Sequence, residues 1–131
     1  LGYAFPTALG CQTAFPERKV VALCGDGGFM YSPQELSTAM RYGLNTVAVV
    51  FNNGAYGASK WDQQHQFNGR FIGTDLFNPD FVAMAKSFGA EGIKTDADSI
   101  EEGLAEALAL DKPTLLEVEI PNMMPPFQIV E

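Results

Sequence analysis

The chain has 131 residues, of which 47% are hydrophobic, and its formal net charge is −8. This size and apolar content suit one packed domain that spans residues 1–131. The acidic excess argues against nucleic acid and against an anionic membrane surface as partners, because both require clustered Lys and Arg. The longest apolar runs, residues 20–24 and 47–51, are far shorter than the ~20 residues that cross a bilayer.

The first residues, Leu1-Gly2-Tyr3, contain neither an initiator methionine nor a signal-peptide pattern, so we expect a piece of a longer polypeptide. Cys11 and Cys24 both sit in apolar sequence, which predicts buried free thiols in preference to a disulfide or a metal pair. These features favour a soluble protein in a reducing, cytoplasmic setting.

The sequence up to residue 28 predicts a helix, a strand and a glycine-rich turn. Residues 6–15 have the pattern of a helix with proline in its first turn. Residues 20–24 form a short continuous apolar run, which is typical of a strand covered on both faces. Gly25-Asp26-Gly27-Gly28 follow at once, so backbone N–H groups at this strand end can approach a ligand closely.

The next segment predicts a second helix and a second buried strand. Ser32-Pro33-Gln34-Glu35 has the form of a capping box, in which the Ser32 hydroxyl accepts from the backbone N–H of Glu35. This helix should run to about Tyr42 and stop at Gly43. Residues 46–51 repeat the buried-strand pattern, and Asn52-Asn53 close that strand.

Residues 53–78 are polar and glycine-rich and have no clean period. A stretch of this length is long for a plain connection in a compact domain, so we expect it to carry function or to contact another chain. Simple packing is the favoured interpretation of its larger rings, with a substrate pocket or an intersubunit surface as the alternatives. These residues are Trp61, His65, Phe67 and Phe71.

The last third of the chain predicts two more helices and two more strands. Asn78-Pro79 should start a helix ending near Gly89, residues 90–95 read as a strand, and residues 114–120 supply the last strand. Between these strands, Asp98 or Ser99 should cap a helix that buries one face. That face consists of Ile100, Leu104 and Leu108. The segment from Met123 to Phe127 is interpreted as a terminal tail, with a lid as the alternative.

The alternation of helices and strands predicts an α/β fold, a parallel sheet with helices on both faces. Ligands of such sheets bind beyond the carboxyl ends of the strands, where both Gly25–Gly28 and Asn52-Asn53 lie. If the two strands are neighbours, Asp26 and Asn53 can converge on one point. The carboxylate of Asp26 would repel a bare phosphate. Its presence at a phosphate site is explained if a cation lies between the carboxylate and the phosphate.

Asp26 and Asn53 are therefore candidate ligands of a divalent cation. A carboxylate oxygen, an amide oxygen, a backbone carbonyl from the following loop, two diphosphate oxygens and a water would complete the octahedral oxygen shell that Mg²⁺ prefers. Softer metals would call for His or Cys, and His65 is the only histidine.

The spacing of Gly25-Asp26-Gly27 from Asn52-Asn53 resembles the motif of thiamine-diphosphate enzymes. The resemblance extends over nearly the whole chain, since residues 1–10 look like the helix start that precedes the motif in that family. Residues 52–58 are similar to the corresponding segment of benzoylformate decarboxylases and, more loosely, of acetolactate synthases. The chain thus resembles the C-terminal, diphosphate-binding (PP-type) domain of this family.

The resemblance implies a set of site residues. Asp26 and Asn53 would ligate Mg²⁺ through their side chains, and Ala55 would do so through its carbonyl. Backbone groups would contact the diphosphate. The cofactor-binding set is Gly25, Asp26, Gly27, Gly28, Phe29, Asn53, Ala55, Tyr56 and Gly57. Some relatives in the pyruvate decarboxylase branch carry a glutamate where this chain has Ser59, so an acid-assisted step of that kind is not expected.

The resemblance also implies a reaction class and partners. In this family the thiazolium carbanion of the cofactor attacks a 2-oxo acid and CO₂ leaves, after which the product is protonated or transferred to an acceptor. A glutamate from a pyrimidine-binding domain, usually in a neighbouring subunit, activates the cofactor, and no residue of this chain can be assigned that role. We therefore expect a 2-oxo acid decarboxylase or carboligase that acts as a homodimer or homotetramer, and an isolated fragment that is inactive.

Other interpretations of the same residues are possible. The Rossmann pattern G-x-G-x-x-G requires a glycine where the chain has Met30, and the G-K-[ST] ending of a P-loop is missing. Asn52 and Asn53 could simply form a turn, because asparagine tolerates left-handed conformations. The alternative function is a non-catalytic nucleotide-binding or regulatory α/β domain, in which Asp26 and Asn53 are structural.

Overall fold

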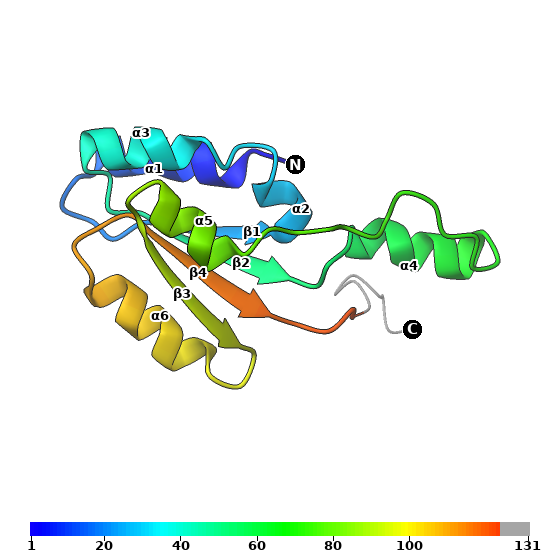
Figure 1. Ribbon diagram of the computed structural model, residues 1–131. Coiled ribbons are helices and arrows are strands. Elements are labelled where there is room, and N and C mark those ends of the chain that lie inside the picture. Colours follow the sequence, from blue (N-terminus) through cyan, green and yellow to red (C-terminus); the bar gives the residue numbers. More distant parts are fainter. Residues whose placement is uncertain (124–131) are drawn as a thin grey trace, which may run out of the picture.

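The computed structural model describes residues 1–123, so the tail predicted from Met123 to Phe127 lies outside the described residues except for Met123. These residues form a four-stranded sheet with helices on both faces (Figure 1). The elements in chain order are α1 (Ala4–Ala14), β1 (Val21–Gly25), α2 (Asp26–Phe29), α3 (Glu35–Tyr42), β2 (Val47–Asn52), α4 (Gly57–Gln66), α5 (Phe81–Ser87), β3 (Glu91–Asp96), α6 (Ile100–Ala109) and β4 (Thr114–Glu119).

The four strands lie in the order β1-β2-β4-β3 and all pairs are parallel. Gly25 of β1 pairs with Phe51 of β2, and Asn52 pairs with Glu119 of β4, so the carboxyl ends of the strands meet at one edge of the sheet. The predicted fold class is confirmed, and the first two strands are neighbours, which was the condition for Asp26 and Asn53 to converge.

The first face of the sheet is covered by α1, α3 and α5 (Figure 1). At its centre three buried rings pack together, with centroids 5.4 Å apart for Phe5 and Phe29 and 6.1 Å apart for Phe29 and Phe81. Aromatic rings bury large apolar areas and add geometric preference of their own, so this cluster is a main source of stability. Through these rings, α1, α2 and α5 pack against one another near the end of β1.

The second face is covered by α6, which lies over β3 and β4. As predicted, Ile100, Leu104 and Leu108 pack against the strands on this face. The prediction that β1 is covered on both faces is wrong, because no described helix lies over its second face. Val21 and Leu23 are consequently 37% and 65% exposed.

The predicted capping box before α3 is not formed. The helix begins at Glu35, and residues 32–37 form successive turns in which the Glu35 N–H donates to the Ser32 carbonyl at 3.2 Å. Since that N–H already has a backbone acceptor, the Ser32 hydroxyl donates instead to the Gly2 carbonyl at 3.3 Å. The predicted stop at Gly43 is confirmed, where a φ of 61° gives the left-handed cap that glycine adopts readily.

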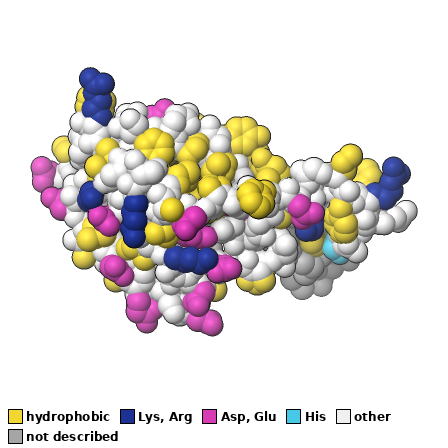
Figure 2. Space-filling view, in the orientation of Figure 1, with side chains coloured by type: hydrophobic (Ala, Val, Ile, Leu, Met, Phe, Trp, Pro, Cys, Tyr) yellow, Lys and Arg dark blue, Asp and Glu magenta, His cyan; other side chains and the backbone are white. Residues whose placement is uncertain are grey.

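Helix α4 was not predicted, because none of its residues is buried and it therefore has no apolar stripe. Together with the segment that returns from it, the helix projects from the body of the molecule (Figures 1 and 2), and we call residues 57–72 the arm. Trp61 stacks on His65 with ring centroids 4.3 Å apart. Phe67 and Phe71 are 59% and 47% exposed, so simple packing is the wrong interpretation for these two rings.

The two cysteines differ in their surroundings. Cys24 points into the first face and is buried, which raises the pKa of its thiol to about 11. Cys11 lies on the solvent side of α1 and is exposed, so its predicted burial is wrong. Both are free, as predicted.

Acidic side chains gather at the bottom of the view over α6 (Figure 2), where Glu101, Glu102 and Glu106 are exposed.

None of the helices in residues 1–123 has the length and apolar character needed to cross a bilayer.

Candidate functional site

The two motifs predicted to form a site lie at adjacent strand ends. Asp26 directly follows β1 and begins α2, while Asn52 is the last residue of β2. Since Gly25 and Phe51 are paired, the next residue on each strand emerges at the same level of the sheet. The topology alone therefore brings Asp26 next to Asn52, from segments 26 positions apart in sequence.

Asp26 is a buried carboxylate, only 2% exposed. Its Oδ1 accepts from the Gly27 N–H at 2.8 Å and its Oδ2 accepts from Nδ2 of Asn78 at 2.7 Å. A buried charge is costly unless it is paired, yet within residues 1–123 no Lys or Arg forms an ion pair with it. Two neutral donors hold a charge that a cation would neutralise.

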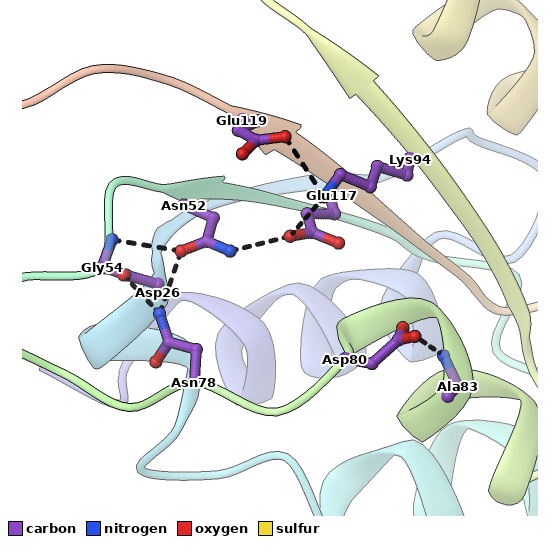
Figure 3. Close-up of polar contacts among 9 residues, drawn as sticks. All are labelled: Asp26, Asn52, Gly54, Asn78, Asp80, Ala83, Lys94, Glu117 and Glu119. Atoms are coloured by element: carbon purple, nitrogen blue, oxygen red, sulfur yellow. Dashed lines mark hydrogen bonds and ion pairs between the residues drawn. The ribbon is translucent and has the colours of Figure 1, made fainter.

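Asn78 connects Asp26 to the end of β2 (Figure 3). Its Nδ2 also donates to Oδ1 of Asn52 at 2.9 Å, an oxygen that accepts from the Gly54 N–H at 3.2 Å as well. The amide of Asn52 in turn donates from Nδ2 to Oε1 of Glu117 at 2.7 Å. A continuous hydrogen-bonded chain thus runs across the carboxyl edge of the sheet.

Glu117 completes this chain from β4 and is 4% exposed. Lys94 on the neighbouring strand β3 approaches it at 3.9 Å and lies closer to the exposed Glu119, at 3.1 Å. The hydrogen bond to Glu119, followed by the charge of Glu117, raises the pKa of Lys94. The sequence offers one signal that could have identified Glu117, an acidic residue between the apolar Leu116 and Val118 in the interior of a strand.

The sequence interpretation gave no role to Asn78 or Glu117. Asn78 was interpreted only as the start of a helix, although α5 begins three residues later, at Phe81. Its side chain is free to reach Asp26 because the residues between β2 and α5 return to the sheet edge. No periodic pattern in the sequence indicates that return.

Asn53 lies one step beyond the chain of hydrogen bonds. Its Oδ1 accepts from the Ala55 N–H at 3.2 Å, and its Nδ2 lies so close to Gly57 that a Cβ there would be 2.8 Å away. No hydrogen bond joins Asn53 to Asp26 among the described residues. The predicted roles of Asn53 and of the Ala55 carbonyl as metal ligands stay predictions.

The glycine turn is closely covered by Tyr56. A Cβ on Gly27 would lie 2.4 Å from Cε1 of Tyr56, so only glycine fits under this ring. Desolvation raises the pKa of the Tyr56 hydroxyl, and the adjacent Tyr31 and Asp26 raise it further. The Tyr56 N–H donates to the Thr74 carbonyl at 2.8 Å, so this predicted diphosphate contact is already engaged. The N–H of Gly27 is likewise engaged, by Asp26.

The donor set favours one kind of metal. Residues 1–123 contain no group of three or more His, Cys, Asp or Glu side chains that could hold a metal ion. Mg²⁺ is usually held by one or two carboxylates and by phosphate oxygens, with waters, so a single buried Asp fits it. A softer metal that requires imidazole or thiolate does not fit.

Comparison with known proteins gives concordant matches. The family model of the thiamine pyrophosphate enzyme, C-terminal TPP binding domain, matches residues 1–118. The chain is 37% identical over 123 residues to an acetolactate synthase large subunit of Parasynechococcus marenigrum, covering 92% of this chain and 20% of that protein. It is 34% identical over 126 residues to a benzoylformate decarboxylase of Pseudomonas aeruginosa, covering 95% of this chain and 24% of that protein.

A solved structure agrees with these sequences. The thiamine diphosphate-dependent 4-hydroxybenzoylformate decarboxylase of Rhodococcus jostii superposes with a TM-score of 0.86 at 35% identity, covering 95% of this chain and 24% of that one. The chain therefore spans between a fifth and a quarter of the length of these three proteins.

Proposed function

Since the chain belongs to the thiamine pyrophosphate enzyme family as its C-terminal TPP binding domain, we propose that the carboxyl edge of its sheet holds the diphosphate of thiamine diphosphate through Mg²⁺. One observation carries the proposal: within residues 1–123, Asp26 is a buried carboxylate without a basic partner, at the end of a strand whose neighbour is followed by Asn53. Asp26 and Asn53 would ligate the cation through side chains and Ala55 through its carbonyl.

The chain's own residues would bind and orient the cofactor. Backbone groups of Gly27, Gly28, Phe29, Tyr56 and Gly57 would face the diphosphate. The N–H groups of Gly27 and Tyr56 would then either leave their present acceptors or share themselves between those acceptors and the diphosphate. The cation would offset both the Asp26 charge and the diphosphate charge, which explains how an acidic chain can hold an anionic cofactor. When bound, thiamine diphosphate supplies the nucleophilic carbanion and the electron sink.

For the whole protein we propose a 2-oxo acid decarboxylase or carboligase, a lyase or transferase of the acetolactate synthase or benzoylformate decarboxylase type. The names of the matched relatives support this class. The activating glutamate and most of the substrate contacts would come from elsewhere, in a pyrimidine-binding domain of a neighbouring subunit in a homodimer or homotetramer. The exposed aromatic side chains of the arm support a contact of this kind. We also propose that the protein works in the cytoplasm.

A thermal-shift experiment on the intact protein tests the site. Thiamine diphosphate with Mg²⁺ should raise the melting temperature, because a ligand at 100 times its Kd stabilises the native state by about 2.7 kcal/mol. Asp26→Ala should abolish the shift and Asn53→Ala should reduce it strongly, whereas Asp98→Ala, at an exposed acid distant in sequence, should leave it intact. An undiminished shift in Asp26→Ala would refute the metal assignment.

The same assay separates the alternative function. A nucleotide-binding or regulatory domain should be stabilised by a nucleotide with Mg²⁺ and not by thiamine diphosphate. For residues 1–131 expressed alone, we expect only weak binding of the cofactor, since its pyrimidine half would lack a partner. Tight binding by this fragment would contradict the proposed division of the site between two domains.

A further inference from the structure

Glu117 occupies an unusual place for a charged residue. Among residues 1–123 it is, with Asp26, one of only two charged side chains that are buried, and it lies within β4, whose residues 114–118 are all buried. Its contacts are the Asn52 amide at 2.7 Å and Lys94 at 3.9 Å. Burying a carboxylate with so few partners costs free energy, and an apolar residue of similar volume would avoid that cost. A role in positioning would account for its presence.

The orientations of the two amides in the chain are fixed by their neighbours (Figure 3). The Gly54 N–H can only donate, so the atom of Asn52 that faces it is Oδ1, and Nδ2 is directed at Glu117. A carboxylate can only accept, so the atom of Asn78 that faces Asp26 is Nδ2. Rotating either amide by a half turn would place two acceptors or two donors in contact. Glu117 and the Gly54 N–H therefore together determine which atom of Asn52 is offered to Asn78, and Asn78 holds Oδ2 of Asp26.

We propose that Glu117, Asn52 and Asn78 form a positioning relay that fixes the orientation of the Asp26 carboxylate for the cation. None of these three side chains would contact the cation itself. This inference rests on the proposed function, since it assumes that Asp26 is a metal ligand. A carboxylate oxygen has two lone pairs, so Oδ2 can keep its bond to Asn78 and still bind a metal. Partners that orient metal ligands typically affect metal affinity by 10- to 100-fold when they are removed.

The relay predicts a distinctive pattern of single substitutions in the intact protein. Mn²⁺, whose free form is detected by electron paramagnetic resonance, serves as the probe for the cation in the presence of thiamine diphosphate. Glu117→Met removes the acceptor and keeps the volume, so the Kd for Mn²⁺ should rise roughly 10- to 100-fold. Glu117→Gln retains an acceptor for Asn52 and should stay within about 3-fold of the wild type, as rescue by a conservative change.

Glu119→Met is the matched control for charge. Glu119 lies on the same strand and the same side of the sheet, two residues further on, and also pairs with Lys94, but it is exposed and takes no part in the relay. It removes the same charge as Glu117→Met, so a purely electrostatic effect on the cation would appear in both variants. We expect Glu119→Met to change the Kd for Mn²⁺ by less than about 3-fold.

Two further measurements distinguish positioning from general support of the fold. Cofactor-free urea unfolding should show Glu117→Met to remain close to the wild type in stability, because the relief of a buried charge offsets the Asn52 Nδ2 donor that loses its acceptor. The double variant Glu117→Met/Asn78→Ala should bind Mn²⁺ no more weakly than Asn78→Ala alone, since both changes break one relay. Multiplicative losses in the double variant would overturn the proposal.

The Mn²⁺ titrations also separate failure of the relay from failure of the proposed function. An unchanged Kd in Glu117→Met, or equal losses in Glu117→Met and Glu119→Met, would refute the relay while leaving the proposed function standing. A wild type that binds no Mn²⁺ in the presence of thiamine diphosphate would refute the proposed function itself. The two failures are therefore distinguishable in one set of titrations.

Discussion

The carboxyl edge of the sheet and the arm are adjacent in the molecule but are held in opposite ways. At the sheet edge, Asp26, Asn52, Asn78 and Glu117 come from four separate segments and are joined by hydrogen bonds of 2.7 to 2.9 Å. In the arm, α4 has no buried residue, and a helix of ten residues without packing is only marginally stable in water. The side chains of the sheet edge are held by contacts with one another, whereas those of α4 are not buried by the described residues.

The base of the arm is nevertheless firmly attached beside the site. The Tyr56 ring lies on Gly27, and the Leu76 N–H donates to the Gly54 carbonyl at 2.8 Å. Ala55, whose carbonyl is a proposed ligand, is 3% exposed and forms a bridge with Asp75. The arm is thus joined directly to the loop that carries Asn53 and Ala55. This difference between rigid base and uncovered arm can be tested by paired substitutions.

The largest expected effect comes from truncating a ring in the body. Phe29 is 1% exposed and contacts both Phe5 and Phe81, so Phe29→Ala should lower the free energy of unfolding by about 3–5 kcal/mol. Phe67→Ala in the arm should change it by no more than about 0.5 kcal/mol if that ring stays exposed. Urea unfolding of the intact protein measures both. A loss of several kcal/mol for Phe67→Ala would show that another part of the assembly covers the arm.

The junction of arm and body should be next in sensitivity. Gly27→Ala places a methyl group within 2.4 Å of the Tyr56 ring, and the required displacement should cost roughly 1–3 kcal/mol and weaken cofactor binding. Gly10→Ala in α1 is the control, since a Cβ there meets nothing within 4 Å and should stabilise the helix by about 0.5–1 kcal/mol. If Gly27→Ala is tolerated as well as Gly10→Ala, Tyr56 is not fixed at the base of the arm.

The sequence identified the elements that have strong local signals. Continuous apolar runs predicted β1 and β2, and the glycine at position 43 predicted the end of α3, because these features depend on neighbouring residues alone. The capping box failed because the N–H of Glu35 found a backbone acceptor first. Helix α4 was missed because an uncovered helix has no apolar period to detect.

The site was predicted in the same uneven way. The parallel order of β1 and β2 follows from alternating elements, so Asp26 and the end of β2 could be placed together from sequence. The hydrogen bonds made by Asn78 and Glu117 could not, because they depend on how a long irregular segment returns to the sheet and on the insertion of β4 beside β2, although an acidic residue within a strand marks Glu117 as unusual. Contacts between residues distant in sequence, made by side chains without a motif, are visible only in the fold.

A helix cap gives a smaller effect within the body. The Oδ1 atom of Asp80 accepts from the Ala83 N–H at 2.8 Å and caps α5, whereas α4 has no side-chain cap at Tyr56. Asp80→Ala should therefore cost about 1 kcal/mol in urea unfolding. Asp80→Asn, which keeps a capping oxygen, should lie within a few tenths of a kcal/mol of the wild type. Equal losses in the two variants would show that charge, and not capping, explains the role of Asp80.

The smallest expected effects concern one exposed ion pair in each region. In the body, the hydrogen bond from Lys112 at 2.9 Å and its charge lower the pKa of Glu91 from its ordinary value. A carboxyl group whose pKa is lower in the folded state contributes stability above its unfolded pKa and loses it as the pH falls through the folded pKa. The difference in stability between the wild type and Lys112→Met should thus be present at pH 7 and disappear in acid. A difference that persists in acid would exclude Glu91 as its source.

The corresponding pair joins Lys60 of the arm to Asp75 at the base of the arm, and the two side chains are 28% and 73% exposed. Salt screens exposed pairs, so the small difference between the wild type and Lys60→Met should vanish at about 1 M salt if the arm is surrounded by water. A pair that is covered by another domain is screened much less and should keep its contribution. The salt dependence of the stability difference between the wild type and Lys60→Met should therefore be measured both in residues 1–131 alone and in the intact protein. A different salt dependence in the two would show that assembly covers the arm. Lys112→Met is the control and should show the same salt dependence in both.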